Sequence, residues 1–154
     1  MNINPAVQTV ADPVLSGKVC PYCNGNTEFT DSAAVYGTIH GMIYLCRPCQ
    51  AWVGVHKGTD QALGRLANAE LRELKMLAHR WFDPIAVEGL INDFYNVYVS
   101  GMSTRAKAYH WLAGQMGIKV EYCHIGMFDT DQCKQVIAIC QPIVESFEGT
   151  GDIW

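Results

Sequence analysis

Two pairs of cysteines in the first third of the chain have the spacing of metal ligands. Cys20 and Cys23 form one C-x-x-C pair, and Cys46 and Cys49 form a second pair after 22 intervening residues. Two thiolates at this spacing converge on one point, and two facing pairs complete a tetrahedral shell of four sulfurs, which zinc accepts readily. We therefore predict one zinc ion held by these four cysteines. Because four sulfurs leave no coordination position for water or substrate, the predicted zinc is structural rather than catalytic.

The four cysteines have two other possible uses, a pair of disulfides and a thiol redox centre. We expect no secretory signal, because residues 1–17 lack a charged start followed by an apolar run, and this disfavours disulfides. Redox motifs of the thioredoxin type do not occur as facing pairs. Reduced thiols predict a cytoplasmic protein. No stretch approaches the length of a membrane span, so we expect no membrane partner.

The charge of the chain is unevenly distributed. The 154 residues carry a net charge of −4, and 49% of them are apolar, which is enough for a sizeable core. Residues 18–80 contain seven Lys and Arg against five Asp and Glu, whereas residues 81–154 contain four against nine. Neither part has the dense basic run that dominates sequence-independent phosphate binding, so a broad coat on DNA is not expected.

Strand-forming residues surround both cysteine pairs. Residues 27–36 suit an extended strand, a turn bracketed by Gly37 and Gly41 follows, and residues 42–45 run into the second cysteine pair. Residues 51–56 form a third short β run directly after that pair. We therefore predict a three-stranded antiparallel zinc ribbon.

Helical periodicity begins after the predicted ribbon. Apolar residues recur at helical spacing over residues 63–81, and Asp83-Pro84 is expected to stop this helix, because the residue before a proline avoids the α region. Residues 85–101 are apolar and aromatic, and both helix and strand are possible there.

Two further helices are predicted in the C-terminal part. Ser103 or Thr104 can cap a helix that ends at Met116, with Gly117 as its stop. Residues 129–140 begin like a capping box and form the last predicted helix, which Gln141-Pro142 is expected to end.

These elements predict an α+β protein, with an N-terminal three-stranded zinc ribbon, held by four cysteine ligands, packed on a C-terminal helical part. The expected organisation is a loosely ordered leader (1–17), the zinc ribbon (18–58), the helical part (59–140) and an acidic tail (141–154).

Aromatic and cationic residues are interleaved on or beside the predicted ribbon. Rings can stack on bases and cations can contact phosphates, which is what single-stranded nucleic acid requires. If residues 51–56 alternate, Trp52 and His56 share one face while Val53 and Val55 share the other, and either face can be the buried one. The candidate binding residues are Tyr22, Arg47, Trp52, His56 and Lys57.

The segment from His56 to Asp60 allows two interpretations. Lys57 and the backbone of Gly58 could form a phosphate clamp. Gly-Thr-Asp is also ordinary turn chemistry, with Thr59 or Asp60 capping the next helix, and we favour this interpretation.

Catalysis is the least favoured alternative. A zinc-framed HNH-like nuclease would need a histidine base and another ligand for a hard metal. The segment between the two cysteine pairs offers Asp31 and His40, and His56 follows the second pair, but the segment lacks the adjacent Asp-His or His-His pair of such enzymes. A zinc deaminase is also disfavoured, because no histidine begins an H-x-E motif.

Two further patterns in the C-terminal part favour core packing. Cys123, His124 and Cys133 could form part of a second metal site, but Cys133 and Cys140 lie on an apolar helical stripe, where free cysteines are usually buried. Residues 108–118 resemble the start of a helix-turn-helix, but the following helix would present acidic residues to phosphates.

Several motifs together resemble a known family. They are Cys20-Pro-Tyr-Cys, Tyr44-Leu-Cys-Arg-Pro-Cys, Val55-His-Lys-Gly-Thr-Asp, Leu66-Ala-Asn-Ala-Glu-Leu-Arg and His124-Ile-Gly-Met-Phe-Asp. Over about residues 18–140 the chain resembles the zinc-finger-containing domain of unknown function that is found in phages and prophages. The resemblance implies a small phage-associated zinc protein, acting in the host cytoplasm.

The leading functional hypothesis is a non-catalytic accessory module that binds nucleic acid or a nucleic-acid-handling complex. The second is a binder or inhibitor of a host protein, such as a defence or transcription enzyme, for which the aromatic run from Phe94 to Tyr98 would be suited. The HNH-like nuclease is the third.

Overall fold

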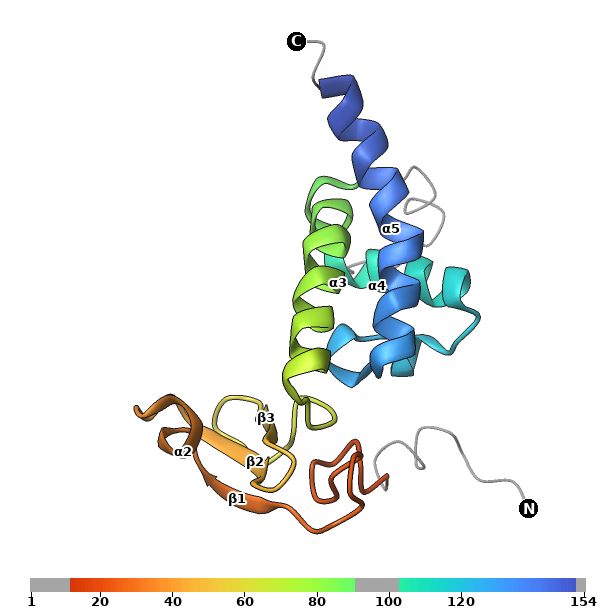
Figure 1. Ribbon diagram of the computed structural model, residues 1–154. Coiled ribbons are helices and arrows are strands. Elements are labelled where there is room, and N and C mark those ends of the chain that lie inside the picture. The colour runs from red at the N-terminus through yellow and green to blue at the C-terminus, as the bar shows by residue number, and fades with distance from the viewer. Residues whose placement is uncertain (1–11, 91–102, 152–154) are drawn as a thin grey trace, which may run out of the picture. The chain divides into compact units, whose positions relative to one another are not determined.

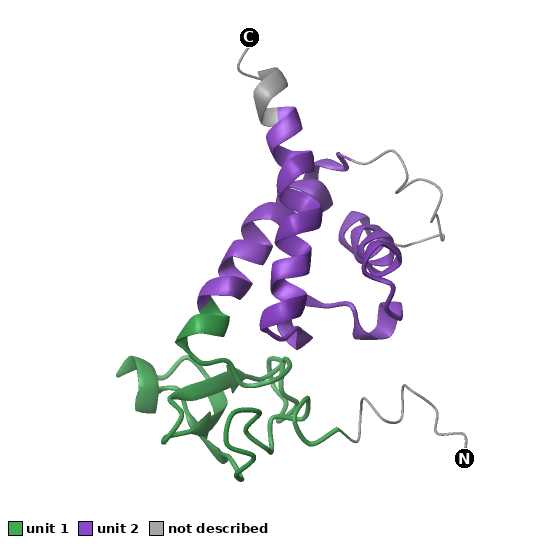
Figure 2. Ribbon diagram, turned by 45° about the vertical axis from the view of Figure 1, so that its right-hand side comes forward, with its two compact units in different colours: residues 1–72 green, residues 73–154 purple. Residues whose placement is uncertain are grey.

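The chain divides into two compact units. The computed structural model describes residues 12–90 and 103–151. Unit 1 comprises residues 1–72 and unit 2 residues 73–154, as coloured in Figure 2. The aromatic run from Phe94 to Tyr98, and with it most of the undecided segment 85–101, lies outside the described residues.

Unit 1 contains a three-stranded antiparallel sheet, which confirms the predicted architecture (Figure 1). Its strands are β1 (Glu28–Asp31), β2 (Met42–Cys46) and β3 (Ala51–Gly54), in the order β1-β2-β3. Leu45 in the central strand lies opposite Glu28 on one side and Trp52 on the other. This register determines which side chains share a face.

The first strand is shorter than predicted. Instead of continuing to Tyr36, the chain turns after Asp31 and forms a one-turn helix, α2 (Ala33–Tyr36). The Asp31 carboxylate accepts the backbone N–H of Ala33, and Gly37 ends the turn in the left-handed conformation with φ 76°. The local hydrogen bond of Asp31 and the left-handed Gly37 therefore override the strand propensity of Val35 and Tyr36. The third strand also ends early, at Gly54.

The two faces of the sheet have different roles. One face contributes to a buried cluster on the side of the cysteine pairs, made of Cys20, Tyr44, Cys46, Ala51, Val53 and Leu66. Because side chains alternate along a strand, Ile43, Leu45, Trp52 and Gly54 lie on the opposite face, which we call the outer face. Of the two faces of β3, the one that bears Val53 is therefore buried in the cluster, and the one that bears Trp52 is not.

The helix α3 (Ala69–Glu88) begins six residues later than the predicted start at Leu63. Before it, Ala67 pairs with Trp52 through two backbone hydrogen bonds of 3.0 and 3.2 Å, so this segment lies beside β3 and is not helical. Asn68 then caps the helix, because its side-chain oxygen accepts the N–H of Leu71 at 3.0 Å.

The predicted stop at Pro84 is wrong, because α3 continues through it to Glu88. A proline inside a helix removes one backbone hydrogen bond. In compensation, Phe82, Ile85 and Ala86 on either side of it are fully or almost fully buried. Packing in unit 2 therefore outweighs the local preference of the Asp83-Pro84 pair.

The start of the next helix follows the prediction. α4 (Thr104–Met116) is capped by Ser103, whose hydroxyl accepts the N–H of Ala106, and ends at Gly117 with φ 69°. Two short 3-10 turns, η2 (Val120–Tyr122) and η3 (Ile125–Met127), lead to the last helix.

The last helix, α5 (Thr130–Gly151), has the predicted start but not the predicted end. Asp129 and Gln132 accept each other's backbone N–H groups, as a capping box does. The expected end at Gln141-Pro142 is wrong. The helix continues because Val144, one turn after the buried Cys140, extends the buried stripe.

In the described parts of the chain, no helix combines the length and the apolar character that crossing a membrane requires.

Candidate metal centre and outer face

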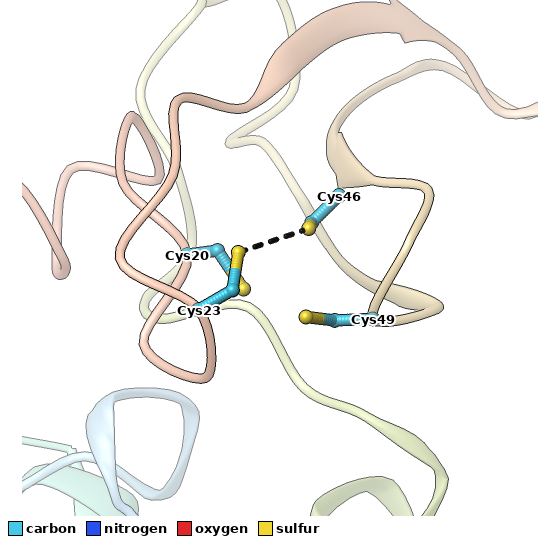
Figure 3. Close-up of side chains that lie close together, drawn as sticks. All are labelled: Cys20, Cys23, Cys46 and Cys49. Atoms are coloured by element: carbon cyan, nitrogen blue, oxygen red, sulfur yellow. Dashed lines mark hydrogen bonds between the residues drawn. The ribbon is translucent and has the colours of Figure 1, made fainter.

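The four predicted zinc ligands converge on one point. Their sulfur atoms all lie within 4.8 Å of one another, and Figure 3 shows the side chains directed toward a common centre. The sulfurs of Cys23 and Cys46 are 3.7 Å apart. Zinc–sulfur bonds of about 2.3 Å in a tetrahedron place the sulfurs about 3.8 Å apart, whereas a disulfide requires about 2.0 Å. The four cysteines therefore fit one zinc ion, as predicted.

The backbone holds each cysteine pair in a tight reversal. The residue directly after each pair, Asn24 or Gln50, has a positive φ of 62° or 50°. In the first pair, Asn24 donates its N–H to the carbonyl of Cys20 at 2.8 Å, and the N–H of Tyr22 points at the sulfur of Cys20 at 3.4 Å. These turns direct the thiols of each pair toward the same side.

The environment of the thiols favours a cation among them. Desolvation, followed by hydrogen bonding among the clustered thiols, raises the pKa of Cys49 to about 12, and desolvation also raises the pKa of Cys46. The pKa of Cys23 is lowered, chiefly by a backbone hydrogen bond from Gly25. Four thiolates this close together repel one another, and a divalent cation offsets that repulsion.

Tyr22 connects the metal centre to the start of α3. Its hydroxyl accepts the backbone N–H of Asn68 at 3.1 Å, and Asn68 is the residue that caps the helix. Tyr22 is 41% exposed, but its hydroxyl is hydrogen-bonded to Asn68 inside unit 1. Tyr22, which was predicted to stack on a base, therefore makes a structural contact within unit 1.

Trp52 is the centre of the outer face. It is half-buried, and the guanidinium of Arg72 lies 3.7 Å from the centroid of its ring. The indole N–H donates to the hydroxyl of Tyr36 at 3.0 Å, and the two rings meet edge to face at 5.9 Å. Arg72 in turn donates to the carbonyl of Ala67 at 2.7 Å. Tyr36 thus fixes the orientation of the Trp52 ring, and the carbonyl of Ala67 fixes that of the Arg72 guanidinium.

Arg47 is exposed but paired. Its guanidinium forms two parallel hydrogen bonds with the carboxylate of Glu28, at 2.9 and 3.0 Å, and this arginine lowers the pKa of Glu28. A ligand phosphate would have to compete with that carboxylate for Arg47.

His56 and Lys57 are both exposed and lie just beyond the end of β3 at Gly54. The Thr59 hydroxyl donates to the carbonyl of His56 at 2.8 Å and accepts the N–H of Gln61, which is the hydrogen bonding of a turn. The expected capping of the next helix by Thr59 or Asp60 is wrong, because that helix begins later and is capped by Asn68.

Two grooves lie beside Trp52 in unit 1. The larger, of about 670 Å³, is called the His40 groove; it is lined by residues that include Tyr36, His40, Trp52 and Lys57. The smaller, of about 320 Å³, is called the Arg72 groove; it is lined by Ala34, Val35, Leu45, Arg47, Gln50, Trp52 and Arg72. Trp52 lines both.

The residues weighed for a nuclease are used within the fold. The Asp31 carboxylate accepts the N–H of Ala33 at the start of α2, and the Nε2 atom of His40 is hydrogen-bonded to the Thr38 hydroxyl at 2.7 Å. His40 lines the groove that bears its name, whereas His56 does not. Over residues 12–90 and 103–151, the close grouping of metal-binding side chains is that of the four cysteines.

The three cysteines of unit 2 are fully buried. Desolvation raises the pKa of Cys123 and of Cys140 to about 12, so both thiols are neutral at physiological pH. Cys133 lies one helical turn before Val136 on the buried stripe of α5.

Sequence reasoning missed three residues that line the grooves beside Trp52: Tyr36, Gln50 and Arg72. The Asp31-Ser32 pair and Gly37 are capping signals that could have placed Tyr36 in a helical turn. Nothing local connects Arg72 to Trp52, because their contact depends on the pairing of Ala67 with β3.

The chain matches a protein family over most of its length. A family described as a zinc-finger-containing domain matches residues 16–143. The match covers both cysteine pairs and agrees with the resemblance inferred from the motifs. Comparisons with curated proteins and with solved structures gave no match.

Proposed function

Because the chain belongs to this family of zinc-finger-containing domains, we propose that it is a zinc-stabilised, non-catalytic module that binds single-stranded nucleic acid on its outer face. The observation that carries the proposal is the Trp52 ring, which has the Arg72 guanidinium 3.7 Å from its centroid and lines two grooves. Following the resemblance, we also assign it an accessory role in phages or prophages, acting in the host cytoplasm.

The charge of unit 1 favours stacking over electrostatic coating. Residues 12–72 contain five Lys and Arg and five Asp and Glu, so their net charge is zero. Duplex binding without sequence preference depends on many phosphate contacts. Single strands offer unpaired bases, and stacking on an aromatic ring contributes about 1–3 kcal/mol per base. One well-placed tryptophan with nearby cations suits the second mode.

Fluorescence anisotropy with a labelled single strand of about twelve nucleotides and the matching duplex tests the proposal at about 20 and about 200 mM salt. We expect the single strand to bind at low salt and more weakly at high salt. Trp52→Ala should weaken binding by about 1–3 kcal/mol, and Trp52→Phe by less, because a ring remains. Trp81→Ala is the matched control, since Trp81 in unit 2 also has an arginine near its ring, Arg80 at 5.2 Å.

Absence of single-strand binding at the lower salt concentration would reject the proposal. Cleavage of the oligonucleotide on addition of magnesium or manganese, lost in His40→Ala or His56→Ala, would instead support the nuclease. A protein partner is the second candidate. Met76 and Val87 in α3 are each 71% exposed, and large exposed apolar residues can contact a partner.

A further inference from the structure

The two grooves beside Trp52 differ in what they offer a ligand. The Arg72 groove contains both members of the cation–π pair, whereas the His40 groove contains the Trp52 ring without the guanidinium. A base that stacks on Trp52 would compete with Arg72 on one side but not in the His40 groove. The His40 groove therefore suits a base, and the Arg72 groove suits a phosphate.

Contacts within the fold hold the side chains of the His40 groove in place. Ser32 is almost fully buried; its hydroxyl accepts the backbone N–H of His40 at 2.6 Å and donates to the carbonyl of Thr38 at 3.1 Å. The His40 ring is held by the Thr38 hydroxyl and by an edge contact with Tyr36 at 5.9 Å. Nδ1 remains as the ring atom that can hydrogen-bond a base or a phosphate. Fixing these groups in advance lowers the entropy cost of binding.

The size of the His40 groove and the placement of Lys57 suit a nucleotide. Its volume of about 670 Å³ lies within the range of small-molecule sites, which is roughly 300–1,000 Å³. Lys57 lines this groove and supplies an ammonium for one phosphate. Gly54 also lines it.

The Arg72 groove has the chemistry of a phosphate site. It contains two guanidinium groups, but Arg47 is engaged by Glu28, whereas Arg72 contacts the Ala67 carbonyl and the Trp52 ring. The positive charge of Arg72 is therefore not neutralised by a carboxylate in those contacts. A planar guanidinium that stacks on a ring can still donate in its plane to a phosphate.

We propose that Trp52 separates two adjacent subsites filled by one single strand: a base and its phosphate in the His40 groove, beside Trp52 and Lys57, and the next phosphodiester at Arg72. This inference rests on the proposed function and adds to it the register of the strand. The smallest ligand that fills both subsites is a dinucleotide with a 5′-phosphate.

The salt dependence of binding tests the two subsites separately. Each phosphate contact to a single strand contributes about 0.7 to the slope of log K against log salt. With hexathymidylate as the probe, we expect Lys57→Gln and Arg72→Gln each to reduce the slope by about 0.7, and the double variant by about 1.4. Lys18→Gln is the matched control, because Lys18 is exposed in the same unit but lines neither groove. It should leave the slope unchanged.

A change on the ligand side removes the risk that a variant misfolds. In 5′-phosphorylated dithymidine, a neutral methylphosphonate replaces the internal phosphodiester. Wild-type protein should then lose about 0.7 of the slope. The methylphosphonate should lower the slope of Arg72→Lys by the same amount, because lysine keeps the charge. It should not lower the slope of Arg72→Gln, provided that this variant retains zinc.

A slope that is insensitive to Arg72→Gln and to the methylphosphonate, with Trp52-dependent binding intact, would overturn the two-subsite inference and leave the proposed function standing. Absence of hexathymidylate binding by the wild type at low salt would overturn both. If Lys18→Gln reduced the salt slope as much as Lys57→Gln and Arg72→Gln do, the attraction would be diffuse, and the assigned subsites would be contradicted.

Discussion

The guanidinium of Arg72 lies 3.7 Å from the centre of the Trp52 ring, although the two residues belong to different elements. The contact depends on where α3 begins, and Asn68 determines that start. Asn68 in turn donates its N–H to the hydroxyl of Tyr22, between two zinc ligands. The metal centre on one face of the sheet is thereby connected to the ring and cation on the other.

Loss of one zinc ligand should unfold this arrangement. Cys20→Ser should reduce bound zinc well below one equivalent and disorder unit 1, because metal binding and local folding are coupled. Zinc content by elemental analysis and circular dichroism measure both effects. Cys133→Ser is the control and should keep a full equivalent. A disulfide among the four cysteines of the metal centre, in purified protein without zinc, would contradict the assignment.

The thiols of unit 2 should react slowly. A thiol with a pKa of about 12, as at Cys123 and Cys140, stays protonated near neutral pH, and the thiolate is the reactive form. Because burial raises the pKa, reactivity should increase only as the pH approaches that pKa or the chain unfolds. In a titration with a disulfide reagent, a chelator should release the four thiols of the metal centre and denaturant the three of unit 2. Rapid native reaction of Cys140 would be inconsistent with its burial.

Tyr22→Phe separates the contact within the fold from base stacking. Loss of the hydrogen bond to Asn68 should lower the free energy of unfolding by about 0.5–1.5 kcal/mol. The ring remains, so oligonucleotide affinity of the zinc-loaded protein should stay near that of the wild type. Chemical denaturation and anisotropy measure the two quantities. If stability is unchanged while affinity falls, the hydroxyl belongs to the ligand site.

Glu28→Gln should strengthen nucleic-acid binding. The substitution removes the carboxylate that pairs with Arg47 and leaves that guanidinium for a phosphate in the Arg72 groove. Affinity at low salt should rise, and the salt slope should increase by about 0.7. Glu70→Gln is the control, because Glu70 is another exposed acid of unit 1 that lines neither groove. Equal gains in both variants would point to general charge effects.

Gly17→Ala should destabilise unit 1 by about 2 kcal/mol or more. Gly17 has φ 81°, and an added Cβ would lie 2.8 Å from the Tyr44 ring and 3.0 Å from Ala62. Gly37→Ala provides the matched control, since φ is 76° there and an added Cβ meets nothing within 4 Å. It should cost only the backbone strain. Equal losses in thermal unfolding would show that the contact with Tyr44 is unimportant.

Features that depend on nearby residues were predictable from the sequence. The zinc ligands follow from the spacing of the cysteines, and the caps of α4 and α5 from Ser103, Gly117 and the Asp129–Gln132 pair. Each cap, and the spacing inside each cysteine pair, is decided by chemistry within a few residues. The three strands were located for the same reason, although their ends were not.

Features that depend on distant contacts were not predictable. Pro84 and Pro142 remain inside helices because the residues around them are buried against other elements. Arg72 meets Trp52 because Ala67 pairs with β3, which no local pattern reveals. In each case tertiary packing outweighs a local preference.

The most direct test of the account is the indole N–H resonance of Trp52 in a nitrogen–proton correlation spectrum, followed as hexathymidylate is added to zinc-loaded protein. We predict that this resonance shifts and saturates together with the backbone amides of Tyr36 and Lys57, while amides of α4 and α5 stay in place. An unshifted Trp52 resonance at saturating oligonucleotide, or shifts confined to unit 2, would contradict binding on the outer face.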